Sequence, residues 1–252
     1  MQRVGSSGSK MRPAIFSAFP HELRQTVRNF RLIKKITEPF EIFIVEHPSH
    51  EILLVQTGMG IGNAEAALEY ILREYKPDFI VSIGFAGALY DAASAGDLIW
   101  PSKVFFINDK VEGTLELPDA EEISARLSGK VTMHEGSVVT LQRWMKKSEI
   151  KKIIPWLPLP VCDMETFPLA QLSVLRGLPF FAVRSITDTA DEEIPHEFLT
   201  VSDKSGKYML SRSLKLLLSK PKLIRKAARL GMTSRIAARN LSHAVRALVE
   251  IL

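Results

Sequence analysis

The chain has 252 residues, of which 46% are hydrophobic, so it can bury a substantial core as one large domain or two small ones. No uninterrupted apolar run approaches the roughly 18 residues that cross a bilayer, and the single cysteine, Cys162, excludes an intramolecular disulfide. The net charge of +5 is uneven, because residues 204–252 carry 12 lysines and arginines and one acidic residue, against 21 and 27 in residues 1–203.

The first ten residues, MQRVGSSGSK, are rich in glycine and serine. They contain neither the apolar segment nor the cleavage site of a secretory signal. We therefore expect a disordered segment over residues 1–10, a single folded domain over residues 11–252, and a location in the cytoplasm.

Strand and helix patterns then alternate along the chain. The predicted elements of this first part are a strand at 14–19, a helix at 21–30, strands at 40–47 and 51–58, a helix that Pro77 ends, and a strand in 79–89. The two strands at 40–47 and 51–58 are placed to form a hairpin across Pro48. This alternation indicates a layered α/β domain with a largely parallel sheet.

Three glycines, Gly58, Gly60 and Gly62, precede the second predicted helix. Such a turn allows phosphate oxygens to approach the backbone at a helix N-terminus, as in dinucleotide-binding proteins. The third glycine follows the second by two residues rather than three, and no acidic residue closes the next strand at the expected distance. The spacing therefore favours a tight turn that lets the helix pack closely.

The second part of the chain continues the α/β pattern. Its predicted elements are a bent strand at 95–106, a helix at 115–127, a strand at 136–140, a strand and helix within 159–177, a core strand from residue 179, and a final helix at 237–252.

Carboxylates follow three of the predicted strands, at Glu22, Glu165 and Asp188. Ligands bind at the carboxyl ends of strands in open α/β sheets. The histidines and the cysteine lack the spacing of zinc ligands, so no metal site is predicted. Several carboxylates without a metal suit the cleavage of a glycosidic bond, whereas for any one of them a helix cap or surface charge is the alternative.

Four motifs then carry a family resemblance: GMGIGNAEAAL (58–68), SIGFAGAL with AGDLI (82–89 and 95–99), DMET (163–166) and VRSITDTAD (183–191). With them the chain resembles the nucleoside phosphorylase and nucleosidase superfamily, most closely bacterial 5′-methylthioadenosine/S-adenosylhomocysteine nucleosidases. The resemblance implies a three-layer α/β/α sandwich with a mixed, largely parallel central sheet. It also implies a homodimer without a cofactor that cleaves the N-glycosidic bond of a purine nucleoside.

The resemblance assigns roles to the carboxylates. Asp188 matches the general acid that protonates N7 of the leaving purine, and Glu22 matches the acid that positions the attacking water. Glu165 matches the carboxylate that binds the ribose hydroxyls, with Met164 packed on the sugar. Protonation removes the negative charge that develops on the purine, while an anionic Glu165 stabilises the oxocarbenium-like sugar.

Further residues complete the predicted site. Those expected to bind substrate are Phe85, Ala86, Gly87, Thr187 and Val139, and those expected to support it are Arg184 and Gly60. Arg184 is expected either to orient the acidic residues or to form a structural ion pair.

Three positions depart from the family pattern. Phe85 stands where the family usually has serine, and Thr187 replaces the commoner serine before Asp188. Val138 and Val139, or Trp144 beyond them, stand where an aromatic residue stacks on the base.

Two reactions remain open at this stage, hydrolysis and phosphorolysis with phosphate as co-substrate. The missing serine and the lack of an arginine in GFAG favour hydrolysis, whereas Arg24 keeps phosphorolysis open. A non-catalytic protein that binds nucleosides or associates with a membrane is the alternative of another class.

A basic helical insertion is predicted at about residues 194–230, which compact nucleosidases lack. Within it, residues 208–232 form an amphipathic, basic pattern interrupted by Pro221. The pattern is typical either of a peripheral membrane contact or of a solvated hairpin that covers the core or a neighbouring subunit. Similar tails occur in phosphorylases that act on adenosylhopane, a lipid-linked adenosine. No nucleic-acid-binding motif is present.

Overall fold

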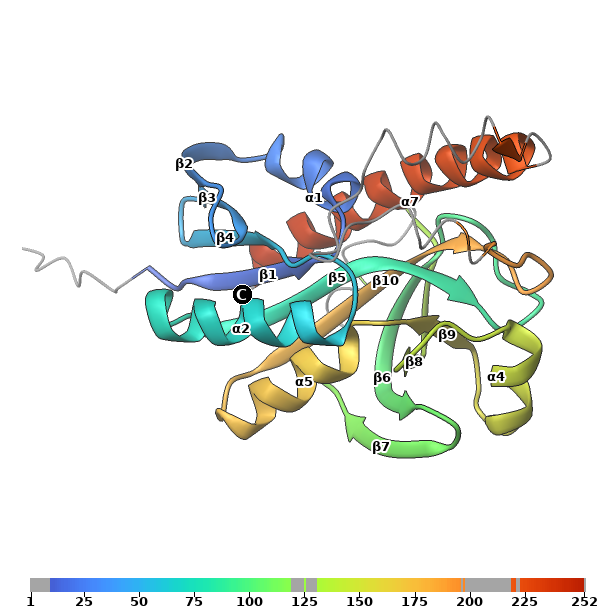
Figure 1. The fold of residues 1–252 in the computed structure, drawn as a ribbon. Coiled ribbons are helices and arrows are strands. Elements are labelled where there is room, and N and C mark those ends of the chain that lie inside the picture. The colour runs from blue at the N-terminus through green and yellow to red at the C-terminus, as the bar shows by residue number, and fades with distance from the viewer. Residues whose placement is uncertain are drawn as a thin grey trace, which may run out of the picture.

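The computed structural model describes residues 10–118, 125, 131–195, 197, 219–220 and 223–251. Over these residues a ten-stranded sheet forms the centre of the molecule, and helices cover both of its faces (Figure 1). The predicted N-terminal disorder concerns residues 1–10, of which only the exposed Lys10 is described.

The strands and helices have the following bounds. The strands are β1 (Pro13–Ser17), β2 (Arg31–Ile36), β3 (Glu41–Glu46), β4 (Glu51–Gln56), β5 (Phe79–Ala88), β6 (Leu98–Ile107), β7 (Val111–Glu116), β8 (Met133–Leu141), β9 (Pro160–Asp163) and β10 (Phe180–Asp188). The helices are α1 (Pro20–Val27), α2 (Ile61–Tyr75), α4 (Lys147–Ile153), α5 (Thr166–Leu175) and α7 (Leu223–Ile251).

The sheet is mixed, with the order β10-β6-β8-β9-β5-β1-β4-β3-β2 and with β7 paired to β6. Strands β4, β1, β5 and β10 run parallel, as do β6, β8 and β9. The pairs β2–β3, β3–β4, β5–β9, β6–β7 and β6–β10 are antiparallel. Because β10 pairs with both β5 and β6, the strands β5, β9, β8, β6 and β10 close into a small barrel.

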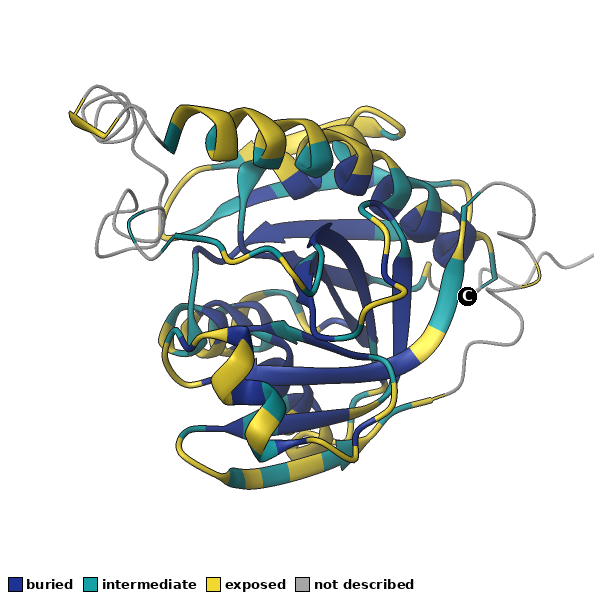
Figure 2. Ribbon diagram, turned by 90° about the vertical axis from the view of Figure 1, so that its right-hand side faces the viewer, coloured by how far each residue is buried: buried dark blue, intermediate teal, exposed yellow. Residues whose placement is uncertain are grey.

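Successive side chains of a central strand point to opposite faces of the sheet, so they pack against different helical layers. In β1, Ile15 packs into a core cluster with residues of α1 and α7, whereas its neighbours Ala14 and Phe16 pack with residues of α2 and α5. The predicted three-layer α/β/α arrangement is thereby confirmed. Figure 2 shows the buried residues concentrated in the strands, with exposed residues on the outer sides of the helices.

Helix α2 shows how the sequence sets the bounds of an element. It follows Gly60, which has a φ of +95° that favours glycine, and it ends where Lys76 adopts the left-handed conformation before Pro77. Its buried face consists of Ala64, Ala67, Leu68 and Ile71.

Within the described residues, three elements differ from the sequence-based expectation. Residues 115–116 belong to β7 and not to a helix, because the alternation of VEGTLE suits the antiparallel pairing with β6. The rest of that predicted helix, apart from residues 117–118 and 125, lies outside the described residues. Strand β2 and helix α4 were not predicted.

The basic insertion is described only in part. The predicted helix around residues 208–218 lies outside the described residues, whereas the basic segment after Pro221 and the predicted final helix form one continuous helix, α7. The interior Gly231 has no neighbouring atoms within 4 Å of a Cβ position and does not interrupt α7. In the described part of the chain, no helix has the length and apolarity to span a membrane.

Candidate active site

The three predicted carboxylates lie near one edge of the sheet. Strands β1, β4, β5 and β10 are parallel, so their carboxyl ends meet at this edge, and β9, which is antiparallel to β5, pairs there with the last residues of β5, Gly87 and Ala88. Glu22 comes from α1, directly after β1, Glu165 lies between β9 and α5, and Asp188 ends β10.

Glu22 is buried at the start of α1 and is held by three hydrogen-bond donors. Its Oε2 accepts hydrogen bonds from Ser17 Oγ at 2.7 Å and from the Phe19 amide at 2.8 Å, and its Oε1 accepts one from the Phe85 amide at 2.8 Å. Burial raises the pKa of Glu22, although these hydrogen bonds act in the opposite direction. The contribution of Phe85 comes from its backbone, so a phenylalanine preserves it.

Glu165 is the residue immediately before α5. Its Oε1 accepts a hydrogen bond at 2.7 Å from the amide of Gly60, at the turn before α2, and its Oε2 accepts one at 3.3 Å from the Met164 amide. Burial, followed by the negative charges of Asp163 and Glu22, raises the pKa of Glu165 to about 8. The predicted supporting role of Gly60 therefore corresponds to a direct hydrogen bond.

Arg184 of β10 forms a buried ion pair with Asp163 of β9, with 2.7 Å between Nε and Oδ2. Its Nη2 also donates hydrogen bonds of 2.6 Å to the hydroxyls of Ser82 and Thr166. The charge of Arg184 favours the ionised forms of both Glu22 and Glu165. Arg184 is therefore a structural ion-pair partner that also lies between two carboxylates, and its role in orienting them stays a prediction.

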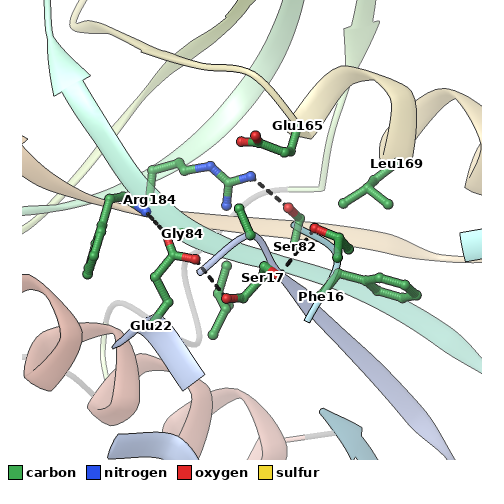
Figure 3. A pocket seen from close by; sticks show the side chains of 12 residues that line it. Phe16, Ser17, Glu22, Ser82, Gly84, Glu165, Leu169 and Arg184 are labelled. Atoms are coloured by element: carbon green, nitrogen blue, oxygen red, sulfur yellow. Dashed lines mark hydrogen bonds between the residues drawn. The ribbon is translucent and has the colours of Figure 1, made fainter. Parts of the chain in front are cut away.

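These groups surround a small cavity, called here the first cavity, with a volume of about 10 Å³. Its lining includes Ser17, Glu22, Phe85, Glu165 and Arg184. Figure 3 shows the Arg184 guanidinium between the two carboxylates, which come from opposite sides. A cavity of this volume has room for about one water molecule.

Asp188 is buried in a different environment. Its Oδ1 accepts a hydrogen bond at 2.9 Å from Thr187 Oγ1, and its Oδ2 lies 2.6 Å from the ammonium of Lys147, the first residue of α4. Gly87 on the neighbouring β5 is needed here, because a Cβ at this position would lie 2.6 Å from Asp188 Oδ2. Lys147 and Asp188 therefore form a buried, closely packed ion pair.

A larger cavity of about 180 Å³, the second cavity, lies between the loop after β10 and the N-terminal half of α7. Thr187, Asp188 and Glu192 line it from the β10 side, and Lys226 and Arg229 line it from α7. Arg229 forms an ion pair with Glu192. The basic C-terminal part of the chain thus adjoins the carboxylate predicted to be the general acid.

The other predicted site residues are spread between these regions. Met164 is half-buried against a core cluster that contains Val139, and neither Ala86 nor Val139 lines either cavity. Both are buried, and the carbonyl of Ala86 lies 3.5 Å from Thr187 Oγ1. Their predicted contacts with substrate stay predictions.

Sequence reasoning missed four polar residues that hold the site, namely Ser17, Ser82, Lys147 and Asp163. Ser17 and Asp163 lie at strand ends, which is a usable signal. Lys147 lies in the run KKSEIKK, which is typical of a solvated helix, so no local signal distinguishes it.

Within the described residues, no group of three or more histidine, cysteine, aspartate or glutamate side chains is arranged to hold a metal ion. The donor set consists instead of carboxylates, hydroxyls, backbone amides and two buried cations. Such a set can bind a polar ligand, hold a water molecule, and move protons.

Related chains are found among known proteins. A family model described as the phosphorylase superfamily matches residues 12–217. The 5′-methylthioadenosine/S-adenosylhomocysteine nucleosidase of Hydrogenovibrio crunogenus is 24% identical over 229 residues, which cover 82% of this chain and 98% of the relative. The nucleosidase of the same name from Buchnera aphidicola is 25% identical over 215 residues, covering 78% and 92% of the two chains.

Solved structures show the same fold. A nucleosidase of that name from Colwellia psychrerythraea, in complex with adenine, matches with a TM-score of 0.74 at 18% identity and covers 96% of this chain and 95% of its own. The futalosine hydrolase of Helicobacter pylori matches with a TM-score of 0.72 at 13% identity, with coverages of 96% and 99%.

Proposed function

Because the chain belongs to the phosphorylase superfamily, we propose that it is an enzyme that hydrolyses the N-glycosidic bond of a 5′-substituted adenosine, of the methylthioadenosine or adenosylhomocysteine type. The observation that carries the proposal is the arrangement of three buried or half-buried carboxylates at one edge of the sheet. Glu22 and Glu165 share a cavity of about the size of a water molecule. Asp188 ends β10, which is separated from β1 by the single strand β5.

The proposed reaction divides the work between these carboxylates. Asp188 donates a proton to N7 of the purine while the bond between the sugar and the base breaks, which makes the purine a better leaving group. Glu165 binds the ribose hydroxyls, and the positive charge that develops on the sugar favours the ionised form of its carboxyl, whose pKa is raised to about 8 in the unliganded site. Met164, next to it, is proposed to pack on the sugar.

Glu22 is proposed to hold the attacking water and to accept its proton. A carboxylate with a raised pKa is a stronger base once ionised, and burial raises the pKa of Glu22. The first cavity, which Glu22 lines, has room for about one water molecule. Arg24, which kept phosphorolysis open, is exposed on α1 and does not line this cavity.

The experiment that tests the proposal incubates the protein with methylthioadenosine, adenosylhomocysteine and inosine, each with and without phosphate. We expect free adenine and a free 5′-substituted ribose from the first two substrates, at rates that do not depend on phosphate. Strict phosphate dependence with a ribose 1-phosphate product would instead establish the phosphorolytic alternative. Absence of cleavage, together with tight nucleoside binding, would favour the non-catalytic alternative.

A peripheral membrane contact through α7 is proposed as a separate property. The N-terminal half of α7 exposes Ile224 and Met232, with exposed fractions of 51% and 66%, and the cations Arg225 and Arg235. Apolar and basic residues on one helix suit an anionic lipid surface. Co-sedimentation with anionic liposomes at low salt tests this contact, and a protein that stays in solution would contradict it.

A homodimer in the cytoplasm is proposed from the family resemblance. Light scattering of the purified protein tests the dimer, for which we expect about twice the chain mass of 28.2 kDa. A mass of one chain would contradict it.

A further inference from the structure

Lys147 is a buried cation in a region where the proposed function requires an acid. The exposed fraction of its side chain is 6%, the same as that of Asp188. Its ammonium has three acceptors, Asp188 Oδ2 at 2.6 Å, the Thr189 carbonyl at 2.6 Å and the Asp188 carbonyl at 3.3 Å. Since an ammonium has three N–H groups, this set satisfies all of them.

The position of Lys147 is fixed by contacts other than the ion pair. Its backbone amide donates a hydrogen bond of 3.0 Å to Glu193 Oε1, in the loop after β10, and the next turn of α4 buries Ile150 completely. Gly87 has no side chain, which gives the ion pair the space it needs. A Cβ at this position would lie 3.2 Å from Lys147 Cε. Three separate elements, α4, β5 and β10, are thus fitted around this one contact.

An ionised Asp188 cannot donate a proton, so a general acid at this position needs a source. The described residues offer its carboxylate two donors, the Thr187 hydroxyl and the Lys147 ammonium. Of these two donors the ammonium is the stronger acid, because a lysine ammonium has an ordinary pKa of about 10.4 and an aliphatic hydroxyl does not ionise in the range of protein side chains. The contact of 2.6 Å between Nζ and Oδ2 is short enough for direct transfer.

We propose that Lys147 is a positioning residue that orients Asp188 and holds the proton that Asp188 passes to the leaving purine. The proposal rests on the proposed function, because it concerns the same reaction. It goes further by assigning the proton source to a residue outside the motifs that carry the family resemblance.

The reaction returns every residue to its starting protonation state. The bond between C1′ and the purine nitrogen breaks and its electron pair stays on the purine, whose N7 takes a proton from Asp188 Oδ2. Asp188 takes its proton from Lys147 Nζ, which becomes a neutral amine. The attacking water leaves its hydroxyl on C1′ and gives its proton to Glu22. Exchange with solvent moves one proton from Glu22 back to Lys147 and completes the cycle.

The test compares two substrates that differ in their need for a proton. Methylthioadenosine has a neutral purine that must be protonated, whereas 7-methylguanosine already carries the positive charge on its base and needs no proton at N7. We compare the wild type with Lys147→Arg, which keeps the positive charge but does not release a proton near neutral pH. Lys147→Met is the second variant, and it removes the charge.

We expect both variants to lose about 10²–10⁴-fold in kcat on methylthioadenosine and much less on 7-methylguanosine. The ratio of the two rates within one variant does not depend on the fraction of folded protein, so a partly unfolded variant still gives an answer. The matched control is Lys151→Met, on the same helix, whose lysine forms an exposed ion pair of 3.7 Å with Asp91. This control is expected to leave both rates unchanged.

Two results would overturn the proposal for a wild type that cleaves both substrates. One is restoration of the methylthioadenosine rate by Lys147→Arg, which would show that only the charge matters. The other is an equal loss on both substrates in both variants, which would show a structural ion pair. A wild type that cleaves neither substrate would overturn the proposed function, and the inference with it. If the wild type cleaves only methylthioadenosine, the rate of Lys147→Arg on that substrate decides. A rate equal to that of the wild type would overturn the proposal.

Discussion

The two buried regions of the site hold their carboxylates in different ways. In the first cavity, Glu22 and Glu165 are held by hydroxyls and backbone amides, while the nearby cation, Arg184, is bonded to Asp163. Asp188, by contrast, is in direct contact with the ammonium of Lys147. Burial without a contacting cation raises the pKa of a carboxyl, so the first cavity is suited to accept a proton. The proposed role of the ion pair beside the second cavity is to supply one.

The largest expected effect comes from removing the carboxyl group of Asp188, beside the second cavity. Asp188→Asn keeps the shape of the side chain but cannot donate a carboxyl proton, so we expect kcat on methylthioadenosine to fall by about 10²–10⁴-fold. The rate of adenine release measures this loss.

The control for Asp188→Asn is the thermal midpoint of unfolding, because the variant also leaves Lys147 without its charged partner. Turnover equal to that of the wild type would contradict the assignment of Asp188 as the acid. It would also remove the contrast between the two regions.

The next largest effect concerns the buried ion pair beside the first cavity. Arg184→Met leaves the buried carboxylate of Asp163 without its partner, and we expect a loss of about 3–5 kcal/mol in the free energy of unfolding. Denaturant titration measures the change. The double variant Arg184→Met/Asp163→Asn should be less destabilised than the sum of the single variants, because the two residues share one interaction. Additive changes in the free energy of unfolding would show that the two residues do not stabilise the fold through a shared ion pair.

The fold was largely predictable because its signals are local. The glycine turn before α2, the apolar runs of β4 and β5 and the Pro77 stop each determine one element through backbone conformation or side-chain period. The edge strand β2 was missed because its sequence, RLIKKI, is charged and mostly exposed. Strand β7 was mistaken for part of a helix because its pairing with β6 is not visible in a single segment.

The site was predictable where one motif carries both the backbone and the side chain. Glu165 follows directly from DMET, and its hydrogen bond to Gly60 joins two recognised motifs. Lys147 was not predictable, because its burial depends on where α4 packs against the loop after β10. A lysine at the start of a basic helix has the same local sequence whether it is solvated or buried.

A pH dependence is expected from the first region. The pKa of Glu165 is raised to about 8, whereas in the unfolded chain it returns to its ordinary value near 4.5. Between these values the folded protein binds more protons, so the free energy of unfolding falls as pH rises, by at most about 1.4 kcal/mol per pH unit. The stabilisation is present below about pH 4.5 and is lost by about pH 8. Denaturant titrations across this window measure the slope.

The matched control for this pH dependence is Glu165→Gln, which cannot titrate. It should show a smaller slope than the wild type over the same window. An unchanged slope would assign the pH dependence to other groups and would weaken the contrast in proton binding between the two regions.

The smallest expected effects come from two glycines that face the two regions. A Cβ at Gly87 would lie 2.6 Å from Asp188 Oδ2, whereas a Cβ at Gly84 would lie 3.2 Å from Glu22 Oε1. The first distance requires the ion pair to move, and the second requires a shift of only a few tenths of an ångström. We therefore expect Gly87→Ala to lower kcat by about 10-fold or more, and Gly84→Ala by less, because small misplacements of reacting groups are costly.

Gly62→Ala is the matched control for these two substitutions. Gly62 lies in α2, and no atom is within 4 Å of its Cβ position, so the substitution should leave kcat unchanged and stabilise the protein by about 0.4–1 kcal/mol. The measurement is kcat on methylthioadenosine for all three variants, with thermal midpoints to separate activity from stability. A larger loss for Gly84→Ala than for Gly87→Ala would reverse the comparison. It would mean that the placement of Glu22 limits the rate more than that of Asp188 and its lysine.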